Sequence, residues 1–240
     1  MRRFYSSRDG FDGSIVTLDL DETHHLRDVL RMKVGDEAAV FDGEGVEFSC
    51  RIEEIGRQAA RLSIISEVKP TSPESNFEIT IAASLLKSDK FDLVIQKAVE
   101  LGVTHFIPIE TVRSEAKAKY SEKKVVRWRR IAIDAAKQCG RARLMTIGDI
   151  VSFDSILNSA KTGGLRVLFS ERSGKALSSL RESPDITAII GPEGGWDDAE
   201  IDLAASRGVE IITLGGRILR AETAAIAITA ILQHRFGDLS

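Results

Sequence analysis

The chain has 240 residues, of which 43% are hydrophobic and 29% charged, and its formal net charge is −3. This composition is typical of a globular protein and excludes collagen-like and low-complexity chains, while the length allows two domains. Its two cysteines, Cys50 and Cys139, show no CxxC spacing, which argues against a disulfide framework or a zinc site and favours a reducing compartment. No apolar run follows the N-terminal arginines or approaches a membrane span, so we expect a soluble, cytoplasmic protein without membrane contact.

The first 70 residues predict a small β domain. Short runs rich in Val, Ile and Phe are separated by turn residues at Asp42-Gly43 and Gly56. One short helix is expected over His24–Arg31. This order predicts a small β-barrel with one helix, whose strands are Glu37–Phe41, Val46–Ile55 and Ala60–Val68.

The segment Lys69–Asn76, KPTSPESN, is the clearest break in the chain. It holds two prolines and two serines between apolar runs, which is typical of a linker. We therefore expect a first domain over residues 1–70, a linker over 71–76 and a second domain over 77–240.

The second domain alternates strands and helices. The expected strands are Phe77–Leu85, Val103–Ile109, Leu165–Phe169, Ile186–Ile190 and Val209–Leu214. The expected helices are Asp89–Leu101, Glu122–Cys139, Asp197–Arg207 and Glu222–Phe236. Because several strands are almost wholly apolar, the pattern predicts an α/β fold whose parallel sheet is covered on both faces.

Local signals set the expected helix ends. Ser88 is a candidate N-cap and Gly102 a stop for the second domain's first helix, while Asp197 and Glu200 form a capping box and Gly208 ends that helix. The helix Glu122–Cys139 is amphipathic. Its expected inner face is Val125, Trp128, Ala132, Ala135 and Ala136, and its expected outer face is Lys123, Arg127, Arg130, Asp134 and Lys137.

Basic residues concentrate between Arg113 and Arg143, where eleven lysines and arginines face three acids. Phosphate binding depends on local charge more than on the total, so this stretch is a candidate RNA-binding surface. A solvated helix face would give the same pattern, and charge alone leaves both interpretations open.

Two loops fall where ligands bind in parallel sheets, beyond the carboxyl ends of the strands. The first, Gly191–Trp196, has three glycines and a proline, so that a flat ligand can approach its backbone closely. It lacks the phosphate-binding patterns GxxxxGK[ST] and GxGxxG, and a simple glycine turn is the alternative.

The second loop, Leu214–Thr223, precedes an apolar helix. Glu222 and Thr223 can serve as helix-start residues, because acids and hydroxyls are favoured there. Cations are disfavoured at a helix start, so Arg217 and especially Arg220 point to a function.

Together, IGPEGGW and LGGRILRAETAA resemble the SPOUT methyltransferases, and within them the bacterial 16S ribosomal RNA (uracil-N3)-methyltransferase family. The resemblance covers nearly the whole chain. It extends to HLRDVLR (His25–Arg31), Lys87–Val103, Arg113-Ser114, Trp128–Arg143 and Arg235–Asp238. The sequence departs from the family at Met145, where proline is frequent, and at Phe169-Ser170-Glu171, where a Pro-Glu pair is frequent.

The resemblance implies a C-terminal trefoil-knotted α/β domain, threaded near residues 190–225, and an N-terminal PUA-like barrel that binds RNA. It implies S-adenosylmethionine as cofactor and a homodimer whose interface includes the helix Glu222–Phe236. The implied cofactor residues are Leu168, Phe169, Ser170, Gly191, Pro192, Glu193, Gly194, Gly195, Leu214, Gly215, Arg217, Ile218, Leu219, Thr223 and Ala224. The implied RNA-binding residues are His25, Arg31, Arg113, Lys123, Arg127, Arg130, Gln138 and Arg141.

The implied reaction is methylation of a uridine N3 in 16S ribosomal RNA, with the assembled small subunit as the expected partner. Methyl transfer needs alignment and no metal, and His24-His25 has no third ligand nearby. We expect Arg220 to stabilise the uracil anion and Glu222 to orient it or the base, with no general base identified. The alternatives are another RNA position, such as ribose 2′-OH or guanine N1, and a non-catalytic ribosome-binding module.

Overall fold

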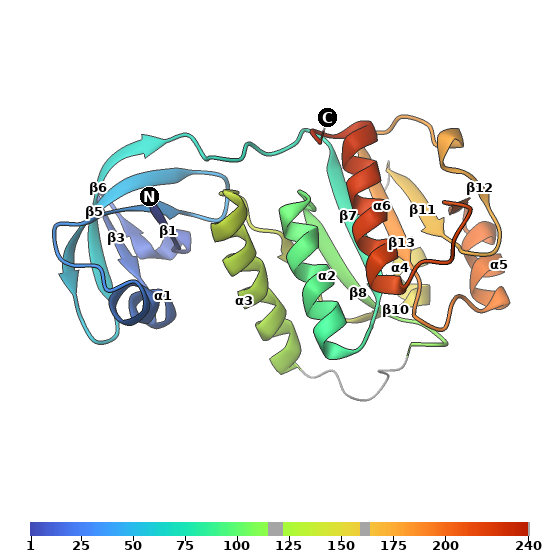
Figure 1. Ribbon diagram of the computed structural model, residues 1–240, viewed down its shortest axis with the longest axis horizontal. Coiled ribbons are helices and arrows are strands. Elements are labelled where there is room, and N and C mark those ends of the chain that lie inside the picture. The colour runs from blue at the N-terminus through green and yellow to red at the C-terminus, as the bar shows by residue number, and fades with distance from the viewer. Residues whose placement is uncertain (115–121, 159–163, 240) are drawn as a thin grey trace. The chain divides into compact units, whose positions relative to one another are not determined.

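The computed structural model describes residues 1–114, 122–158 and 164–239 (Figure 1). The chain forms two compact units. Unit 1 contains residues 1–74 together with 133–144, and unit 2 contains residues 75–132 together with 145–240. The long helix α3 (Glu122–Cys139) begins in unit 2 and ends in unit 1, so the division in space is not a single cut along the chain.

Unit 1 is built on one six-stranded sheet in the order β1-β4-β5-β6-β3-β2. Only β1 and β4 pair in parallel among its strands. Phe4, Leu18, Leu26, Ile52 and Leu62 are fully buried between this sheet and its helix. The strands are β1 (Arg2–Tyr5), β2 (Phe11–Asp12), β3 (Ile15–Leu18), β4 (Glu37–Phe41), β5 (Glu47–Ile55) and β6 (Ala60–Val68). The three longest were predicted from the sequence.

The helix of unit 1 starts earlier than its sequence predicted. Helix α1 (Leu20–His24) follows Asp19, whose side chain accepts a hydrogen bond from the Glu22 N–H at 2.9 Å. The π-helical turn η2 (His25–Val29) continues it. The prediction of His24–Arg31 was therefore wrong at both ends, because the cap residue Asp19 sets the start. Arg31 follows the turn with a positive φ of 53°.

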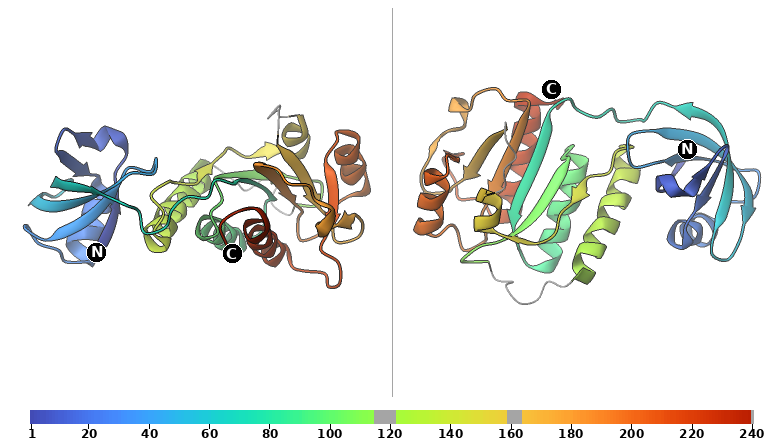
Figure 2. Two further views of the ribbon diagram at one scale, coloured as in Figure 1. Left: turned by 90° about the horizontal axis from the view of Figure 1, so that it is seen from above. Right: turned by 180° about the vertical axis from the view of Figure 1, so that it is seen from behind.

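Unit 2 contains a parallel sheet in the order β10-β8-β7-β13-β11-β14-β12, with β9 paired to β8, which confirms the predicted α/β class. Its helices cover both faces, α2 and α6 side by side on one and α4 and α5 on the other (Figure 2). The strands are β7 (Glu78–Ser84), β8 (His105–Glu110), β9 (Thr146–Ile147), β10 (Val151–Ser152), β11 (Leu165–Phe169), β12 (Lys175–Ala176), β13 (Asp185–Ile190) and β14 (Glu210–Thr213). The helices are α2 (Ser88–Glu100), α4 (Phe153–Asn158), α5 (Asp198–Ser206) and α6 (Ala221–Phe236), and short 3-10 turns occur at Arg8–Gly10 and Leu177–Ser179.

The predicted ends of α2, α3, α5 and α6 all lie within one residue of those in the structure. The capping box of Asp197 and Glu200 opens α5, and Gly102 and Gly208 follow their helices with positive φ values of 78° and 74°. The expected cap at Ser88 was wrong, because α2 already includes Ser88 and its N-cap is Lys87. The fragments β9, β10, α4 and β12 were not predicted.

The outer face of α3 also differs from its prediction at one residue. Lys137 was expected to face solvent, yet its side chain is 9% exposed. Its ammonium lies 2.6 Å from Glu22 and 2.8 Å from Asp134. Helical periodicity alone could not show that an acid of α1 lies against this part of the helix.

Arg3 holds the last turn of α3 within unit 1. Its guanidinium forms two 2.9 Å hydrogen bonds with Glu47 and donates to the carbonyls of Ala136 and Arg141, at 2.8 and 3.0 Å. Both partners of the ion pair are largely buried, with side chains 10% and 5% exposed. Since helix C-termini leave carbonyls without internal donors, Arg3 both caps α3 and neutralises Glu47.

We expect Arg3→Met to lower the free energy of unfolding by about 3–5 kcal/mol, because it leaves a buried carboxylate without its cation. Urea denaturation followed by circular dichroism measures the loss, and hydrogen exchange localises it to β4, β5 and the end of α3. The exposed neighbour Arg2 is the matched control, and Arg2→Met should change stability by less than about 0.5 kcal/mol. Equal stability of the two variants would contradict this role of Arg3.

Within the described ranges, no helix is both long and apolar enough to span a membrane.

Candidate active site

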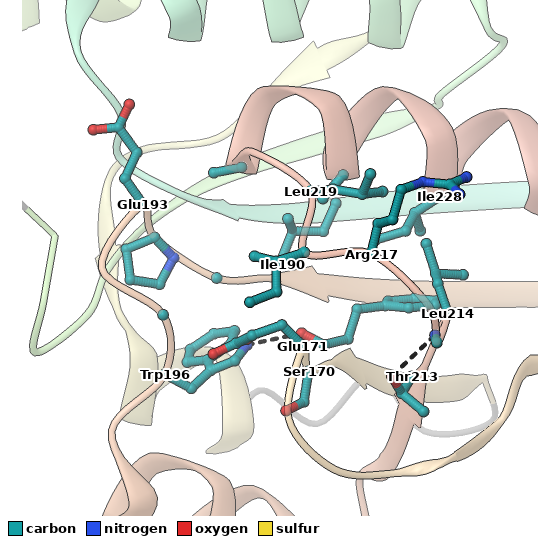
Figure 3. Close-up of a pocket in the computed structure, with 18 of the residues that line it drawn as sticks. Ser170, Glu171, Ile190, Glu193, Trp196, Thr213, Leu214, Arg217, Leu219 and Ile228 are labelled. Carbon is teal, nitrogen blue, oxygen red and sulfur yellow. Dashed lines mark hydrogen bonds between the residues drawn. The ribbon is translucent and has the colours of Figure 1, made fainter.

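A pocket of about 310 Å³ lies at the carboxyl ends of β11, β13 and β14 in unit 2 (Figure 3). This is the edge at which parallel sheets bind ligands. Three loops form its walls, which are residues 170–171, 191–196 and 214–219, and the first turns of α6 complete it. Its lining is Phe169, Ser170, Glu171, Ile190, Gly191, Pro192, Glu193, Gly194, Gly195, Trp196, Thr213, Leu214, Gly215, Gly216, Arg217, Ile218, Leu219, Ala221, Ala224 and Ile228.

The buried side chain of Trp196 anchors the loop Gly191–Trp196 in the protein interior. This indole is fully buried, packs against Phe153 at 5.1 Å between ring centroids, and donates from Nε1 to the Phe169 carbonyl at 2.8 Å. A Cβ at position 191 would lie 2.7 Å from the same Nε1. The indole therefore requires glycine at position 191, and Gly191 also lines the pocket, where the sequence predicted that its bare backbone serves a ligand.

The loop after β14 forms the opposite wall. Gly215 and Gly216 both have left-handed backbones, with φ values of 72° and 75°, and the Gly215 N–H donates to Thr213 Oγ1 at 3.2 Å. Ile218 also lines the pocket although 83% of its surface is exposed. An apolar side chain at the open rim of a pocket suits contact with a bound molecule.

The loop after β11 contributes Ser170 and Glu171. Ser170 Oγ accepts hydrogen bonds from the N–H groups of Arg172 and Ser173, at 3.3 and 3.4 Å, which turns the chain sharply at the strand end. Glu171 lines the pocket opposite Gly195, where an added Cβ would lie 2.6 Å from Glu171 Oε1.

Beside the pocket, three sequence-distant side chains form an ionic cluster of Lys90, Glu193 and Glu222. The Lys90 ammonium forms a hydrogen bond with Glu193 Oε1 and lies 3.4 Å from Glu222 Oε1. The hydrogen bond from Lys90 to Glu193 is the main cause that raises the pKa of Lys90 above its ordinary value. Lys90 was not among the residues singled out from the sequence.

Most residues that the sequence assigned to a cofactor line this pocket. The exceptions are Leu168, which is buried within β11, and Thr223, which is exposed on α6. Pocket residues that the sequence missed are Glu171, Ile190, Trp196, Thr213, Gly216, Ala221 and Ile228. Four of them, Ile190, Trp196, Gly216 and Ala221, lie inside the two quoted motifs and could have been included on that ground.

The two expected catalytic residues, Arg220 and Glu222, precede and follow the pocket residue Ala221 in the chain. Arg220 is the exposed N-cap residue of α6, and Glu222 follows Ala221, which lines the wall. Neither residue is among those that line the cavity, and both are chain neighbours of Ala221, which does line it.

The residues assigned to RNA differ in their surroundings. Arg113 lies beside the pocket loop, 3.1 Å from Asp197 and 3.4 Å from the Gly194 carbonyl. Arg127 pairs with Asp92 at 2.6 Å. Lys123, Arg130 and Gln138 are exposed. Lys117 and Lys119, part of the basic stretch, lie outside the described residues.

Arg141, which was expected to contact phosphates, forms an ion pair with Glu74. Its side chain is only 3% exposed, and its guanidinium forms hydrogen bonds of 3.0 and 2.7 Å with Glu74. In unit 1, His25 is half-buried near Phe4, and Arg31 is exposed.

The described residues contain no group of three His, Cys, Asp or Glu side chains arranged to hold a metal ion.

Two models of known protein families match this chain. Residues 73–233 match the model of an RNA methyltransferase domain, and residues 18–65 match the model of an RNA methyltransferase PUA domain. The chain belongs to this RNA methyltransferase family. The resemblance stated from the sequence motifs is thus confirmed, and the two family models fall on the sheet of unit 1 and on the parallel sheet of unit 2.

Relatives match over most of the chain. The ribosomal RNA small subunit methyltransferase E of Bacillus subtilis is 33% identical over 88% of this chain and 87% of its own. The protein of the same name from Rickettsia conorii is 32% identical over 98% of this chain and 94% of its own.

Solved structures of the family share the fold. The ribosomal RNA small subunit methyltransferase E of Neisseria gonorrhoeae, solved with S-adenosylmethionine, superposes with a TM-score of 0.92, 33% identity and full coverage of both chains. A methyltransferase of Legionella pneumophila, in complex with the bound cofactor S-adenosylmethionine, gives 0.91, 32% identity and 99% coverage of both chains.

Proposed function

We propose that this chain methylates N3 of a specific uridine in 16S ribosomal RNA, with S-adenosylmethionine as methyl donor. The pocket formed by the loops Gly191–Trp196 and Leu214–Leu219 carries the proposal, since these loops hold the motifs of the family. Relatives named for methylation of small-subunit ribosomal RNA match nearly the whole chain, and two structures of high similarity hold S-adenosylmethionine.

The pocket residues suit this cofactor. The volume of about 310 Å³ lies at the small end of ligand pockets, which fits one folded nucleoside with its amino-acid tail. Ile190, Leu219 and Ile228 offer apolar surface to an adenine ring, while backbone groups of the glycine loops can bond its edges. Glu171 and Glu193 add negative charge beside a ligand whose sulfonium is positive. When bound, the cofactor supplies the methyl group.

Arg220 is proposed as the group that stabilises the reacting uracil. Arg220 is exposed, precedes the pocket residue Ala221, and makes no hydrogen bond to cap α6. Uridine N3 becomes a good nucleophile only as its proton leaves, and charge then develops on the neighbouring carbonyl oxygens. A cation placed there stabilises that charge.

RNA binding is proposed for two surfaces, one on each unit. On unit 2, Lys123, Arg127 and Arg130 follow the exposed side of α3. On unit 1, His25 lies in the π-helical turn and Arg31 has a positive φ. Both backbone features are uncommon for side-chain-bearing residues and concentrate at functional sites. For Arg141 we propose a structural role at the end of α3, because its buried side chain forms an ion pair with Glu74.

We expect Lys123→Ala and Arg130→Ala each to weaken binding to 16S ribosomal RNA and to reduce its salt dependence. Each lost phosphate contact should lower the slope of log K against log salt by about 1. Filter binding at several salt concentrations measures the slope. Arg166→Ala, at a side chain that donates to the Leu157 and Arg207 carbonyls, serves as the control on another surface. An unchanged slope in both α3 variants would make α3 an ordinary solvated helix.

We further propose a cytoplasmic homodimer that acts on the assembled small subunit. Helix α6 supports the dimer, because it carries no charged residue between Glu222 and His234 and its Ile226 and Ile231 are only half-buried. The threading of residues 190–225 through a knot, which the resemblance implies, stays a prediction.

A catalytic role is tested against the alternative of a non-catalytic binding module by supplying S-adenosylmethionine with a labelled methyl group. Calorimetry should show binding of the cofactor, and label should enter 16S ribosomal RNA, in small subunits or in naked transcript. Absence of both signals would favour the binding module. Comparing the two substrates shows whether the assembled subunit is needed.

A further inference from the structure

Lys90 joins three segments at the edge of the pocket. It lies in the first turn of α2, Glu193 lies in the loop after β13, and Glu222 lies in the first turn of α6. Lys90 and Glu193 are 103 positions apart in the chain. The side chains of Lys90, Glu193 and Glu222 are 29%, 22% and 13% exposed, so water screens this cluster only in part.

The contrast with Lys97 shows that this arrangement is not an ordinary helix-surface ion pair. Lys97 lies on the same helix and pairs with Glu100, three residues along, at 2.8 Å. That pair is local to α2. Lys90 instead contacts two carboxylates from other segments of the chain.

The two oxygens of Glu222 have different surroundings. Oε1 lies 3.4 Å from the Lys90 ammonium. Oε2 is buried and has no hydrogen-bond partner among the described residues. A buried carboxylate oxygen without a donor is unfavourable, so a donor brought by a ligand would be stabilised there. Glu222 directly follows Ala221, a residue of the pocket wall.

We propose that Lys90 is a positioning residue that holds Glu222 by Oε1, so that the other oxygen of this carboxylate accepts the N3 proton of the uridine. The proposal rests on the proposed function and deepens it, since it names the proton acceptor of that reaction. Arg220 then stabilises the uracil carbonyls, and Glu222 removes the proton.

The step balances in atoms and charge. The N3–H bond breaks, the proton passes to the Glu222 carboxylate, and the freed N3 electron pair bonds to the methyl carbon. The bond from that carbon to sulfur breaks and its electron pair stays on the sulfur. The proton on Glu222 is later released to solvent, which restores the carboxylate.

The test compares Glu222→Gln and Lys90→Met on small subunits that contain either uridine or 5-fluorouridine. Fluorine withdraws electrons and makes N3–H more acidic, so a base matters less. On uridine we expect Glu222→Gln to lower the rate about 100- to 10,000-fold, the range for general bases. On 5-fluorouridine the defect should shrink at least about tenfold, which a purely structural loss would not do.

Lys90→Met should lower the rate about 10- to 100-fold, the cost of misplacing a reacting group, with a smaller defect on 5-fluorouridine and recovery in Lys90→Arg. Lys97→Met is the matched control and should react at the normal rate. A stability measurement that needs neither cofactor nor RNA complements these rates. In urea denaturation, the effects of Lys90→Met and Glu222→Gln should be non-additive in the double variant, since the side chains interact.

Distinct outcomes separate the inference from the proposed function. If the unaltered chain forms no N3-methyluridine, the proposed function fails. If it does, but the Glu222→Gln and Lys90→Met rates are normal, or their defects are equal on both nucleosides, the inference is overturned. Additive stability effects would overturn the pairing of Lys90 with Glu222.

Discussion

Arg220→Ala should lower the rate of methyl transfer about 100- to 1,000-fold, the cost of removing one preorganised donor from a reacting oxyanion. The affinity for S-adenosylmethionine should stay near normal, because the Arg220 side chain does not line the pocket. Within the described part of the chain, its guanidinium has no hydrogen-bond or ion-pair partner. The exposed cation is thus available to an incoming base.

Arg220→Lys separates charge from shape. Lysine keeps the positive charge but loses the planar fork that can meet a carbonyl with two donors, so we expect an intermediate rate. Arg181→Ala, at an exposed arginine that does not line the pocket, is the control and should react normally. Single-turnover rates with saturating cofactor measure the chemical step. Near-normal rates in both Arg220 variants would remove Arg220 from the mechanism.

Gly191→Ala should weaken cofactor binding and also destabilise unit 2. The added methyl group would lie 2.7 and 2.8 Å from Nε1 and Cε2 of Trp196. The indole has little room to yield, because it is fully buried and tied to the Phe169 carbonyl. The loop must shift instead, at a cost of about 1–3 kcal/mol.

The loop shift reaches the ligand because the same residues line the pocket. We expect the dissociation constant for S-adenosylmethionine to rise at least about tenfold, equivalent to ~1.4 kcal/mol. Calorimetry measures affinity, and thermal unfolding measures stability. Gly148→Ala is the matched control, since its Cβ would meet its nearest neighbour at 3.7 Å, an ordinary contact. Unchanged affinity in Gly191→Ala would mean that the cofactor lies elsewhere.

Local signals in the sequence were enough to predict the frame of the site. The strands β11 and β13 are mostly apolar, with Arg166 in the first and Asp185 and Thr187 in the second, and the capping box at Asp197 and Glu200 needs only neighbouring residues. Because parallel strands end at one edge, the amino-acid pattern alone places the loops after β13 and β14 together. The short strands β9 and β12 have two residues each, too few for a pattern.

The parts that could not be predicted depend on contacts between distant segments. The segment Lys87–Val103 contains Lys90, but its sequence does not show the partners of this lysine, because they lie on another loop and another helix. Lys137 and Arg141 resemble surface cations in the sequence, yet Glu22 and Glu74 pair with them in unit 1. The glycine at 191 suggested a ligand, and the adjacent indole also requires it. In each case a local pattern indicated the residue type, and a tertiary neighbour set its role.

Identification of the methylated atom tests the proposed reaction most directly. Small subunits that lack the modification would be incubated with the purified chain and labelled S-adenosylmethionine, and the digested 16S ribosomal RNA analysed by mass spectrometry against nucleoside standards. We expect one labelled nucleoside, N3-methyluridine, at a single position. Label in a 2′-O-methyl nucleoside or in N1-methylguanosine, or no label at all, would contradict the proposed reaction.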